Sequence, residues 1–430
     1  MKATSAAVAT AMHALVLILM IAAGPARAAT PVGLIAQPCI NPATAFIFTN
    51  PDSHIAIVPA GACRPTVLTS GADTDQTPNW DGTTIVFQRN GADIGGYSTM
   101  TVPAAGGAVT NLGAVACAPS GPVCGSEIQP SFAPNGQILF STVDGGPTGP
   151  YGNFNTSIWV MNADGSSPLR LLQTGVDAIS NQAAFVSPDG NTLAFECGPF
   201  NSAPFQICKV SLTYTSSKIT GISGFTQLTS ATGAASADPH WSPDGTKILF
   251  NSQQATNVAS ATVNTGGSGF GASVSGTMTW NGGGCWINPV LNVTTNSSQA
   301  IASVTGVQNP GGCNPLPSSA SGSWTAGGGL SAGGGASFNL SGQAGVNLFT
   351  MTSSGGSVTE LTTCVEPTEC QDGGWSADGT TIVEEVDWGG NYSQNVNAPA
   401  AVWGMTSGGG NPHAVGASCA QSGCAPRFHP

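Results

Sequence analysis

The chain has 430 residues, of which 7% are charged, and its 21 acidic residues outnumber the nine basic ones, giving a net charge of −12. Protein binding to phosphate backbones depends on clustered Lys and Arg, so this balance disfavours nucleic acid, anionic lipid and polyuronate ligands. A cation, a neutral glycan or another protein suits an acidic chain better. The abundance of Gly, Ser, Thr, Asn and Ala favours strands and turns over helices.

The N-terminal segment has the pattern of a secretory signal peptide over residues 1–28. A positive start at Lys2 is followed by an apolar stretch over residues 6–23 and by the small-residue cleavage site Ala26-Arg27-Ala28. A retained membrane anchor is the alternative, but the apolar core is short and no stop-transfer charges follow it. Cleavage would leave seven basic against 21 acidic residues, a net charge of −14. No later window holds about 18 apolar residues, so we expect no membrane span afterwards and a periplasmic or extracellular protein.

One β-hairpin motif recurs along the chain and predicts the fold. The copy over residues 238–250 contains an aromatic residue, a Pro-Asp-Gly turn that needs positive φ, and an apolar strand. A second hairpin follows each copy, as at residues 158–172, so that one repeat has four strands and about 53 residues. Such four-stranded units are the blades of a β-propeller, which bury both sheet faces against their neighbours. We place the aromatic position of the six copies at Trp80, Phe132, Phe185, Trp241, Trp375 and Phe428.

The two ends of the chain are predicted to complete one blade together. Residues 44–49, 55–59 and 66–68 supply three strands that lack a first strand, whereas residues 424–430 form a first strand with nothing after it. Pairing them would close the ring and remove an open sheet edge. The predicted fold class is therefore all-β, a six-bladed β-propeller over residues 29–430 whose first blade is closed by the C-terminal strand.

An insertion over residues 255–345 interrupts the fifth blade between its second and third strands. It is almost free of charge, yet apolar and polar residues alternate over residues 273–280, 290–293 and 300–304, which predicts strands. We interpret it as a small β subdomain; a disordered Gly/Ser loop and a degenerate seventh blade are the alternatives. Long loops on rigid scaffolds often carry binding functions, so the insertion is the first candidate for the distinguishing function of this protein.

Twelve cysteines follow the predicted signal peptide, and disulfides are the default for an exported chain. Sequential pairing is expected because the close pairs fall at the same place in the repeat. Zinc binding by these thiols is the alternative, but the chain has no C-x-x-C motif and its histidines are scattered. The cysteines are Cys39, Cys63, Cys117, Cys124, Cys197, Cys208, Cys285, Cys313, Cys364, Cys370, Cys419 and Cys424.

The repeat resembles the TolB-like family, also called the WD-like propeller repeat, over nearly all of residues 40–430 outside the insertion. That resemblance implies an extracytoplasmic binding propeller. One family member docks on a peptidoglycan-associated lipoprotein and carries an α/β domain ahead of its propeller; only about a dozen residues separate Ala28 from the first strand here, so a true TolB is not expected. Oligogalacturonate lyases, whose repeats are similar, hold a metal with His, but this chain has few Arg and Lys to neutralise an acidic sugar.

Candidate chemistry is sparse. Asp75, Glu127, Asp238 and Asp372 each come just before the first strand of a blade, where loops surround one mouth of a propeller channel. They are predicted to form an acidic rim that binds a divalent cation through oxygen ligands or meets a basic partner, with turn capping as the alternative. The Gly329–Gly333 segment matches the G-x-S-x-G pattern, but it lies in a glycine-rich stretch without the helix that a nucleophile elbow requires.

The sequence therefore favours an exported, non-catalytic binding or scaffold propeller that engages a protein or cell-envelope component through a channel face or the insertion. A metal-assisted propeller enzyme that acts on a polysaccharide or peptide is the alternative, and a purely structural surface protein is a third. We expect no catalytic residue and no cofactor other than the possible cation.

Overall fold

The structure is a computed structural model, and it describes residues 42–91, 96–117, 127–144, 155–172, 180–198, 204–230, 234–317, 323–364, 368–388, 400–419 and 424–428. Within these ranges nearly all regular elements are strands, and the one helix is α2 (Gly113–Cys117). No helix in this part of the chain is long and apolar enough to cross a membrane. The predicted signal peptide lies outside the described residues.

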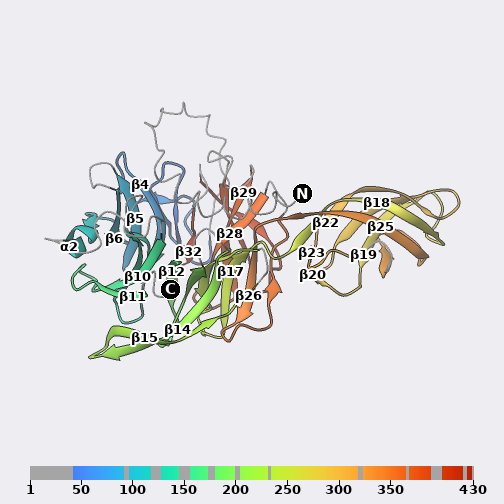
Figure 1. Ribbon diagram of the computed structural model, residues 1–430. Coiled ribbons are helices and arrows are strands. Elements are labelled where there is room, and N and C mark those ends of the chain that lie inside the picture. Colours follow the sequence, from blue (N-terminus) through green and yellow to red (C-terminus); the bar gives the residue numbers. More distant parts are fainter. Residues whose placement is uncertain are drawn as a thin grey trace. The chain divides into compact units, whose positions relative to one another are not determined.

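Six four-stranded antiparallel sheets repeat the predicted unit (Figure 1). The first contains β1 (Phe46–Thr49), β2 (Ile55–Val58), β3 (Thr66–Val67) and β32 (Arg427–Phe428); the second, β4 (Thr74–Trp80), β5 (Thr84–Gly91), β6 (Gly96–Pro103) and β7 (Thr110–Asn111). The third contains β8 (Glu127–Phe132), β9 (Ile138–Asp144), β10 (Asn155–Met161) and β11 (Leu169–Leu172); the fourth, β12 (Ser180–Val186), β13 (Thr192–Gly198), β14 (Gln206–Thr215) and β15 (Lys218–Gln227). The fifth contains β16 (Ser236–Trp241), β17 (Lys247–Ser252), β26 (Asn347–Thr352) and β27 (Thr359–Glu360); the sixth, β28 (Thr368–Trp375), β29 (Thr381–Trp388), β30 (Ala400–Thr406) and β31 (His413–Cys419).

Apolar residues fill the spaces between neighbouring sheets. Ile47 and Ile55 of the first sheet pack with Ile85 and Phe87 of the second, and similar clusters join the second sheet to the third and the third to the fourth. Another cluster joins the first sheet to the sixth, so the sheet that contains both chain ends also packs face to face with the last sheet of the repeat. This arrangement confirms the all-β propeller.

The chain ends share the first sheet. Strand β32 pairs with β1, with Phe46 opposite Phe428 and Ile47 opposite Arg427. The rings of Phe46 and Phe428 lie 6.4 Å apart in an edge-to-face arrangement that aromatic pairs favour. An edge of β1 that would otherwise be open is thereby covered.

The repeated Asp of the hairpin turns has a structural function. Asp189 Oδ1 accepts hydrogen bonds from Ser187 Oγ at 2.5 Å and from the backbone N–H of Asn191 at 3.0 Å. Asp244 and Asp378 accept equivalent bonds from a serine two residues earlier. These serine hydroxyl bonds lower the pKa of all three carboxyl groups. The carboxylate closes the turn and lets glycine take the positive φ that follows.

One position of the repeat was assigned wrongly from the sequence. Val186, not Phe185, lies opposite Leu193, which matches the pairing of Trp80 with Ile85 and of Phe132 with Ile138. Phe185 instead corresponds to His240 of the next sheet, and the two rings lie 3.9 Å apart. Phe185 was assigned to this position because it is aromatic. The pairing register, however, depends on the number of residues between the position and the hairpin turn.

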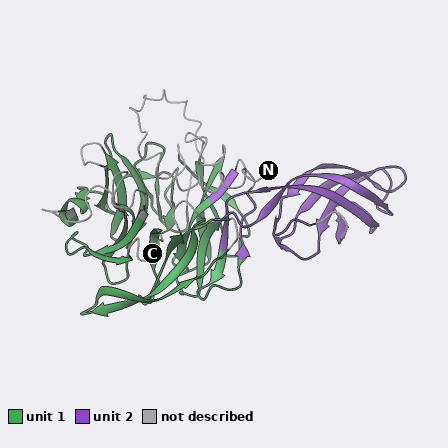
Figure 2. Cartoon of the chain, viewed as in Figure 1, with its two compact units in different colours: residues 1–251, 350–358, 371–430 green, residues 252–349, 359–370 purple. Residues whose placement is uncertain are grey.

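The chain divides into two compact units, drawn in different colours in Figure 2. The second consists of residues 252–349 and 359–370 and includes the insertion. The insertion folds into two four-stranded sheets around its own apolar core, in which Phe270, Met278 and Phe338 are buried. One sheet contains β18 (Thr256–Ser268), β20 (Cys285–Ile287), β23 (Gly312–Cys313) and β25 (Gly334–Ala344); the other contains β19 (Ser275–Trp280), β21 (Val290–Thr295), β22 (Ile301–Asn309) and β24 (Trp324–Gly327). The insertion is therefore an ordered β subdomain, neither a structureless loop nor a single extra blade.

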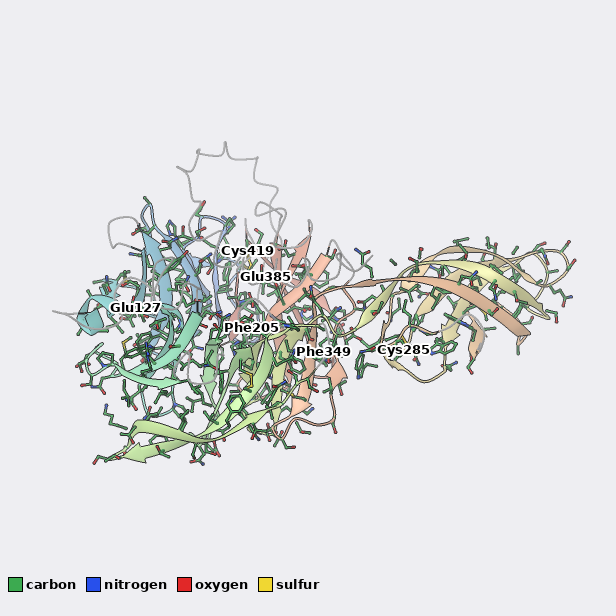
Figure 3. All side chains as sticks on the ribbon, in the orientation of Figure 1. Glu127, Phe205, Cys285, Phe349, Glu385 and Cys419 are labelled. Atoms are coloured by element: carbon green, nitrogen blue, oxygen red, sulfur yellow. A yellow bond between two sulfur atoms is a disulfide. The ribbon has the colours of Figure 1, made fainter. Side chains whose placement is uncertain are left out.

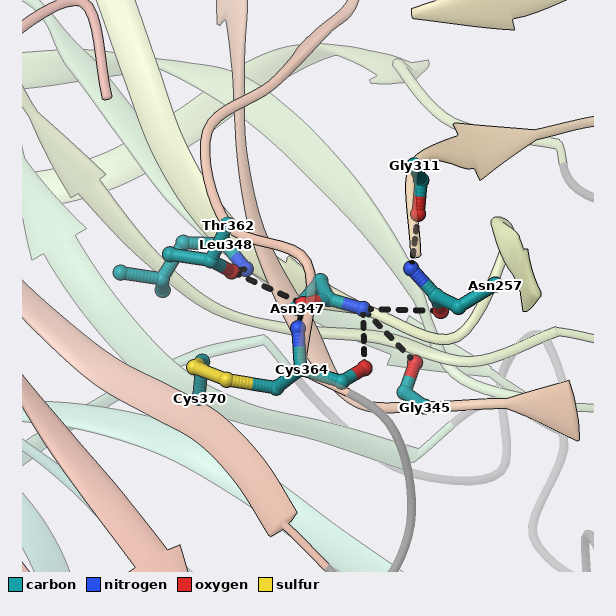
Figure 4. Close-up of a disulfide and its surroundings, with 8 residues drawn as sticks. All are labelled: Asn257, Gly311, Gly345, Asn347, Leu348, Thr362, Cys364 and Cys370. Atoms are coloured by element: carbon teal, nitrogen blue, oxygen red, sulfur yellow. Dashed lines mark hydrogen bonds between the residues drawn. A yellow bond between two sulfur atoms is a disulfide. The ribbon is translucent and has the colours of Figure 1, made fainter. Parts of the chain in front are cut away.

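A fully buried amide network lies within the second unit, beside a disulfide (Figure 4). Asn347 Oδ1 accepts hydrogen bonds from Thr362 Oγ1 at 3.0 Å and from the backbone N–H of Cys364 at 2.6 Å. Its Nδ2 donates to the carbonyl of Cys364 and to Oδ1 of Asn257, whose own Nδ2 donates to the carbonyl of Gly311. The network links the start of β18, where the chain enters the insertion, to the start of β26, where the chain has left it.

Four of the expected sequential disulfides are present: Cys197–Cys208, Cys285–Cys313, Cys364–Cys370 and Cys419–Cys424. Cys63 is also disulfide-bonded. Cys39 and Cys124 lie outside the described residues. These nine cysteines thus form crosslinks, as an oxidising compartment permits.

Candidate functional site

The first strand of each propeller sheet contains, or directly follows, a residue in the left-handed conformation. Six such residues, one per sheet, have φ between 39° and 51°, a conformation that is uncommon for residues other than glycine. In three sheets the pairing register shifts at this point, which is the mark of a β-bulge. The six residues are Thr77, Gln129, Ala183, Asp238, Asp372 and Ala425.

Hydrogen bonds between sheets hold five of these residues in place. The backbone N–H of each donates to a side-chain oxygen of the preceding sheet. The pairs are Gln129 with Gln88 Oε1 (3.1 Å), Ala183 with Gln129 Oε1 (3.2 Å), Asp238 with Glu196 Oε1 (2.8 Å), Asp372 with Asn251 Oδ1 (3.1 Å) and Ala425 with Glu385 Oε2 (3.3 Å). Four of the five acceptors are buried polar side chains of second strands, and they satisfy the backbone N–H groups at the left-handed positions of the neighbouring sheet.

Asp238, Asp372 and Arg427 lie together in the propeller. All three contribute to the wall of a small cavity of about 30 Å³, which is room for about two water molecules. Arg427 Nη1 donates to the backbone carbonyls of Asp372 and Pro426, each at 2.9 Å. Asn251 Nδ2 donates to Asp238 Oδ2 at 3.1 Å. The cluster joins the fifth, sixth and first sheets.

Burial and repulsion make one proton bind tightly within this cluster. Burial, the negative charge of Asp372 and a hydrogen bond between the two carboxyl groups raise the pKa of Asp238 well above its usual value. Burial also raises the pKa of Glu196 to about 7, although Glu196 accepts hydrogen bonds from the Asp238 backbone and from Gln182 Nε2 at 2.8 Å. The Asp238 carboxyl therefore keeps its proton to a higher pH than an exposed aspartate does.

The four acidic residues predicted just before first strands lie within those strands, and only two of the four line the cavity. Asp238 and Asp372 are brought together, but Asp75 is fully buried and accepts a two-pronged ion pair from Arg89, with Nε 2.6 Å from Oδ1 and Nη2 2.9 Å from Oδ2. Glu127 is buried beside Gly113, where burial raises its pKa to about 7. Figure 3 shows Glu127 well apart from Glu385, which lies in β29.

The reason for the separation is a difference of two residues in register. Asp238 and Asp372 themselves occupy the left-handed position of their strands. In the other two strands Thr77 and Gln129 occupy that position, and Asp75 and Glu127 come two residues earlier. Glu196 and Glu385 were missed from the sequence because they belong to the second strands of their blades, where they appear only as polar residues directly after the apolar part of the strand. Arg427 lies in the first strand β32, two residues after the left-handed Ala425.

The arrangement offers acid–base groups but little room. His240 is buried, and burial together with Arg427 lowers its pKa well below the usual value, so its ring is neutral. Among the described residues, no three side chains of His, Cys, Asp and Glu gather in a way that could hold a metal ion. The Gly329–Gly333 segment connects β24 to β25, so that a strand follows it and not the helix of a nucleophile elbow.

The comparisons with known proteins give only a distant likeness. No protein-family model and no curated protein matches this chain. A putative TolB from Agrobacterium tumefaciens is 13% identical, with 90% of this chain and 98% of that chain covered and a TM-score of 0.48. A putative 6-phosphogluconolactonase from Bacteroides uniformis is 14% identical over 90% and 99%, with a TM-score of 0.42, and an oligogalacturonate lyase from Vibrio parahaemolyticus is 10% identical over 84% and 73%, with a TM-score of 0.37. At this level none of these proteins says anything about the site, and the propeller fold rests on the sheets of the chain itself.

Proposed function

We propose that this protein is an exported, non-catalytic binding propeller and that its insertion is the element that engages an uncharged component of the cell envelope. The observation that carries the proposal is the distribution of charge. Residues 252–349 contain no Asp, Glu, Lys, Arg or His, although the whole chain contains 30 acidic and basic residues. A surface built from hydroxyl, amide and apolar groups suits a neutral glycan or a neutral protein surface, because no charge has to be desolvated on contact.

The exposed aromatic residue of the insertion supports this assignment. Trp286 is 37% exposed, and its ring meets Phe349 edge-on at 5.7 Å. Its neighbour Cys285 forms the disulfide with Cys313, so the strand that carries the ring is crosslinked. An anchored, partly exposed indole provides apolar contact area at a low entropic cost.

The channel cluster supports a non-catalytic propeller for a separate reason. The carboxyl groups of Glu196 and Glu385 beside it accept hydrogen bonds from the backbone of Asp238 and Ala425 in adjacent sheets, and the cavity of about 30 Å³ is smaller than a sugar ring or a peptide. The groups with the most perturbed pKa values thus have structural functions, a common source of such perturbation.

The test is a cross-linking capture from an envelope extract, joined to a screen of neutral polysaccharides. One bait is the mature protein and a second lacks residues 256–344. Thr256 pairs with Ala344 in adjacent strands, so a Gly-Gly link can rejoin the flanking residues without strain on the propeller. The matched control carries Asp238→Asn and Asp372→Asn. A ligand retained by the control and lost with the deletion supports the proposal, whereas a ligand lost only with the control refutes it.

The alternative function, a metal-assisted enzyme, is favoured by one observation, the two aspartates Asp238 and Asp372 in the wall of the same cavity. A divalent cation bound there would favour the ionised form of Asp238, whose pKa burial and Asp372 raise. Calorimetric titration of the mature protein with Ca²⁺ and Mn²⁺, with and without the two Asn substitutions, decides the matter. Heat of binding that disappears in the double variant would favour the cation site, and no heat from the mature protein would eliminate it.

A further inference from the structure

The longest unprotected sheet edge of the described residues belongs to the insertion. Strand β25 has 11 residues, and in the described part of the chain its only partner is β18, on one side. In an antiparallel ladder alternate residues point their N–H and C=O groups away from the partner strand. Over residues 334–342, alternate backbone polar groups of β25 therefore face outward along this edge.

The propeller blades protect their edges, whereas β25 does not. The outermost strands β3, β7 and β27 have two residues each, and β11 has four. The longer outer strands carry a basic side chain, Lys218 in β15 and His413 in β31. Short strands and charged residues are the usual means by which proteins prevent edge-to-edge pairing, and β25 has neither.

The side chains of β25 are suited to pairing with an identical strand. Ala336 and Phe338 point into the core of the insertion, while Asn339 and Ser341 are exposed. Asn339 is the middle residue of the strand, so it would meet the Asn339 of a second copy across a two-fold axis. Amide and hydroxyl side chains in such opposed positions can hydrogen-bond across the junction.

Charge selects a second copy as the occupant of this edge. The chain carries a net charge of −12, so two molecules repel each other wherever their acidic parts meet. Pairing through the insertion brings no charged side chain of either copy into the new sheet. We infer that the protein forms a two-fold dimer by antiparallel pairing of β25 with β25 of a second copy. This inference does not rest on the proposed function, because an envelope component can bind the insertion whether or not this edge is paired.

The test measures the molecular mass of the mature protein by analytical ultracentrifugation over a wide range of concentration. A strand-edge contact is smaller than a standard protein interface, so a reversible, concentration-dependent dimer is expected. Hydrogen exchange of the β25 amides should slow as the dimer forms. A monomer at every concentration, or a dimer that persists after deletion of residues 256–344, would overturn the inference.

Charge substitutions separate edge pairing from loss of folding. Asn339→Lys places two lysines opposite each other and is expected to raise the dimer Kd by about tenfold or more. Asn292→Lys is the matched control, because Asn292 lies in β21, a central strand with neighbours on both sides. Mixing Asn339→Lys with Asn339→Asp should restore a dimer that neither variant forms alone. If the two substitutions at 339 leave the Kd unchanged, β25 is not the interface.

Discussion

Glu384 is a carboxyl group in a place that other blades fill with phenylalanine. It lies in β29 at the position of Phe87, Phe140 and Phe195, and it is 2% exposed. Oε2 has no hydrogen-bond partner among the described residues, and burial raises the pKa of the group to about 8 from a usual value of 4.5. A buried carboxyl that must stay protonated at neutral pH makes folding depend on pH in an unusual direction.

The sign follows from proton binding in the two states. Below pH 4.5 the carboxyl is protonated in both the folded and the unfolded chain and contributes no difference. As the pH rises towards 8, the unfolded chain releases the proton and the folded chain keeps it, so the free energy of unfolding falls. The loss is about 1.4 kcal/mol for each pH unit, or up to about 5 kcal/mol in total, and it is constant at higher pH.

Glu384→Gln is the perturbation that isolates this effect, because the amide keeps the shape of the side chain and does not titrate. We expect the wild-type protein to lose about 3–4 kcal/mol more than the variant between pH 5 and pH 8. Urea unfolding of the oxidised proteins at the two pH values measures the difference. Glu384→Phe, which restores the residue of the other blades, should show the same reduced pH dependence and a higher stability at pH 8.

The other buried glutamates remain in both proteins and cancel in this comparison. Burial raises the pKa of Glu127 and Glu196 to about 7 and that of Glu360 to about 8, so they add to the pH dependence of wild type and variants alike. If the unfolding free energy of Glu384→Gln fell as steeply between pH 5 and pH 8 as that of the wild type, Glu384 would be ionised in the folded protein. The reasoning from burial would then be wrong.

Two further substitutions test the hydrogen-bonded clusters. Asn347→Ala should lower the free energy of unfolding by about 2–4 kcal/mol, because it leaves Thr362, Asn257 and the backbone of Cys364 without partners. Chemical unfolding with the disulfides intact checks this value, and a loss below about 0.5 kcal/mol would mean that water replaces the amide. Arg427→Met should destabilise the protein by about 2 kcal/mol, because it removes the positive charge beside Asp372, Asp238 and Glu385. The exposed Arg64→Met is the control, and an equal loss from both substitutions would show that the charge of Arg427 has no special effect.

Much of the fold could be predicted because its signals are local. A Pro-Asp-Gly turn between an aromatic residue and an apolar strand specifies a hairpin within about a dozen residues, and its repetition identifies the propeller. The incomplete sets of strands at the two ends indicated that β32 would join β1. Alternation inside the insertion indicated strands, although nothing in the sequence showed that they would form two sheets around one core.

The site was less predictable, as the four acidic residues show. The sequence placed Asp75, Glu127, Asp238 and Asp372 in similar loops, but it contained no measure of the two-residue offset between Asp75 and Asp238 relative to the left-handed position. Because of that offset, Asp238 lines the cavity, whereas Asp75 pairs with Arg89. The misassigned Phe185 has the same cause, because the register of a bulged strand depends on hydrogen bonds to the neighbouring sheet.

The amino-acid sequence by itself determined the all-β class, the repeat, the use of cysteines as crosslinks and the uncharged insertion, since each depends on composition or on spacing along the chain. Only the tertiary structure decided that Asp238, Asp372 and Arg427 share a cavity and that, among the described strands, β25 pairs with β18 alone. These residues come together from strands of different repeats, separated by 134 and 55 positions. Their burial, their pKa values and the hydrogen bonds they lack are properties of that packing, which no local pattern in the chain records.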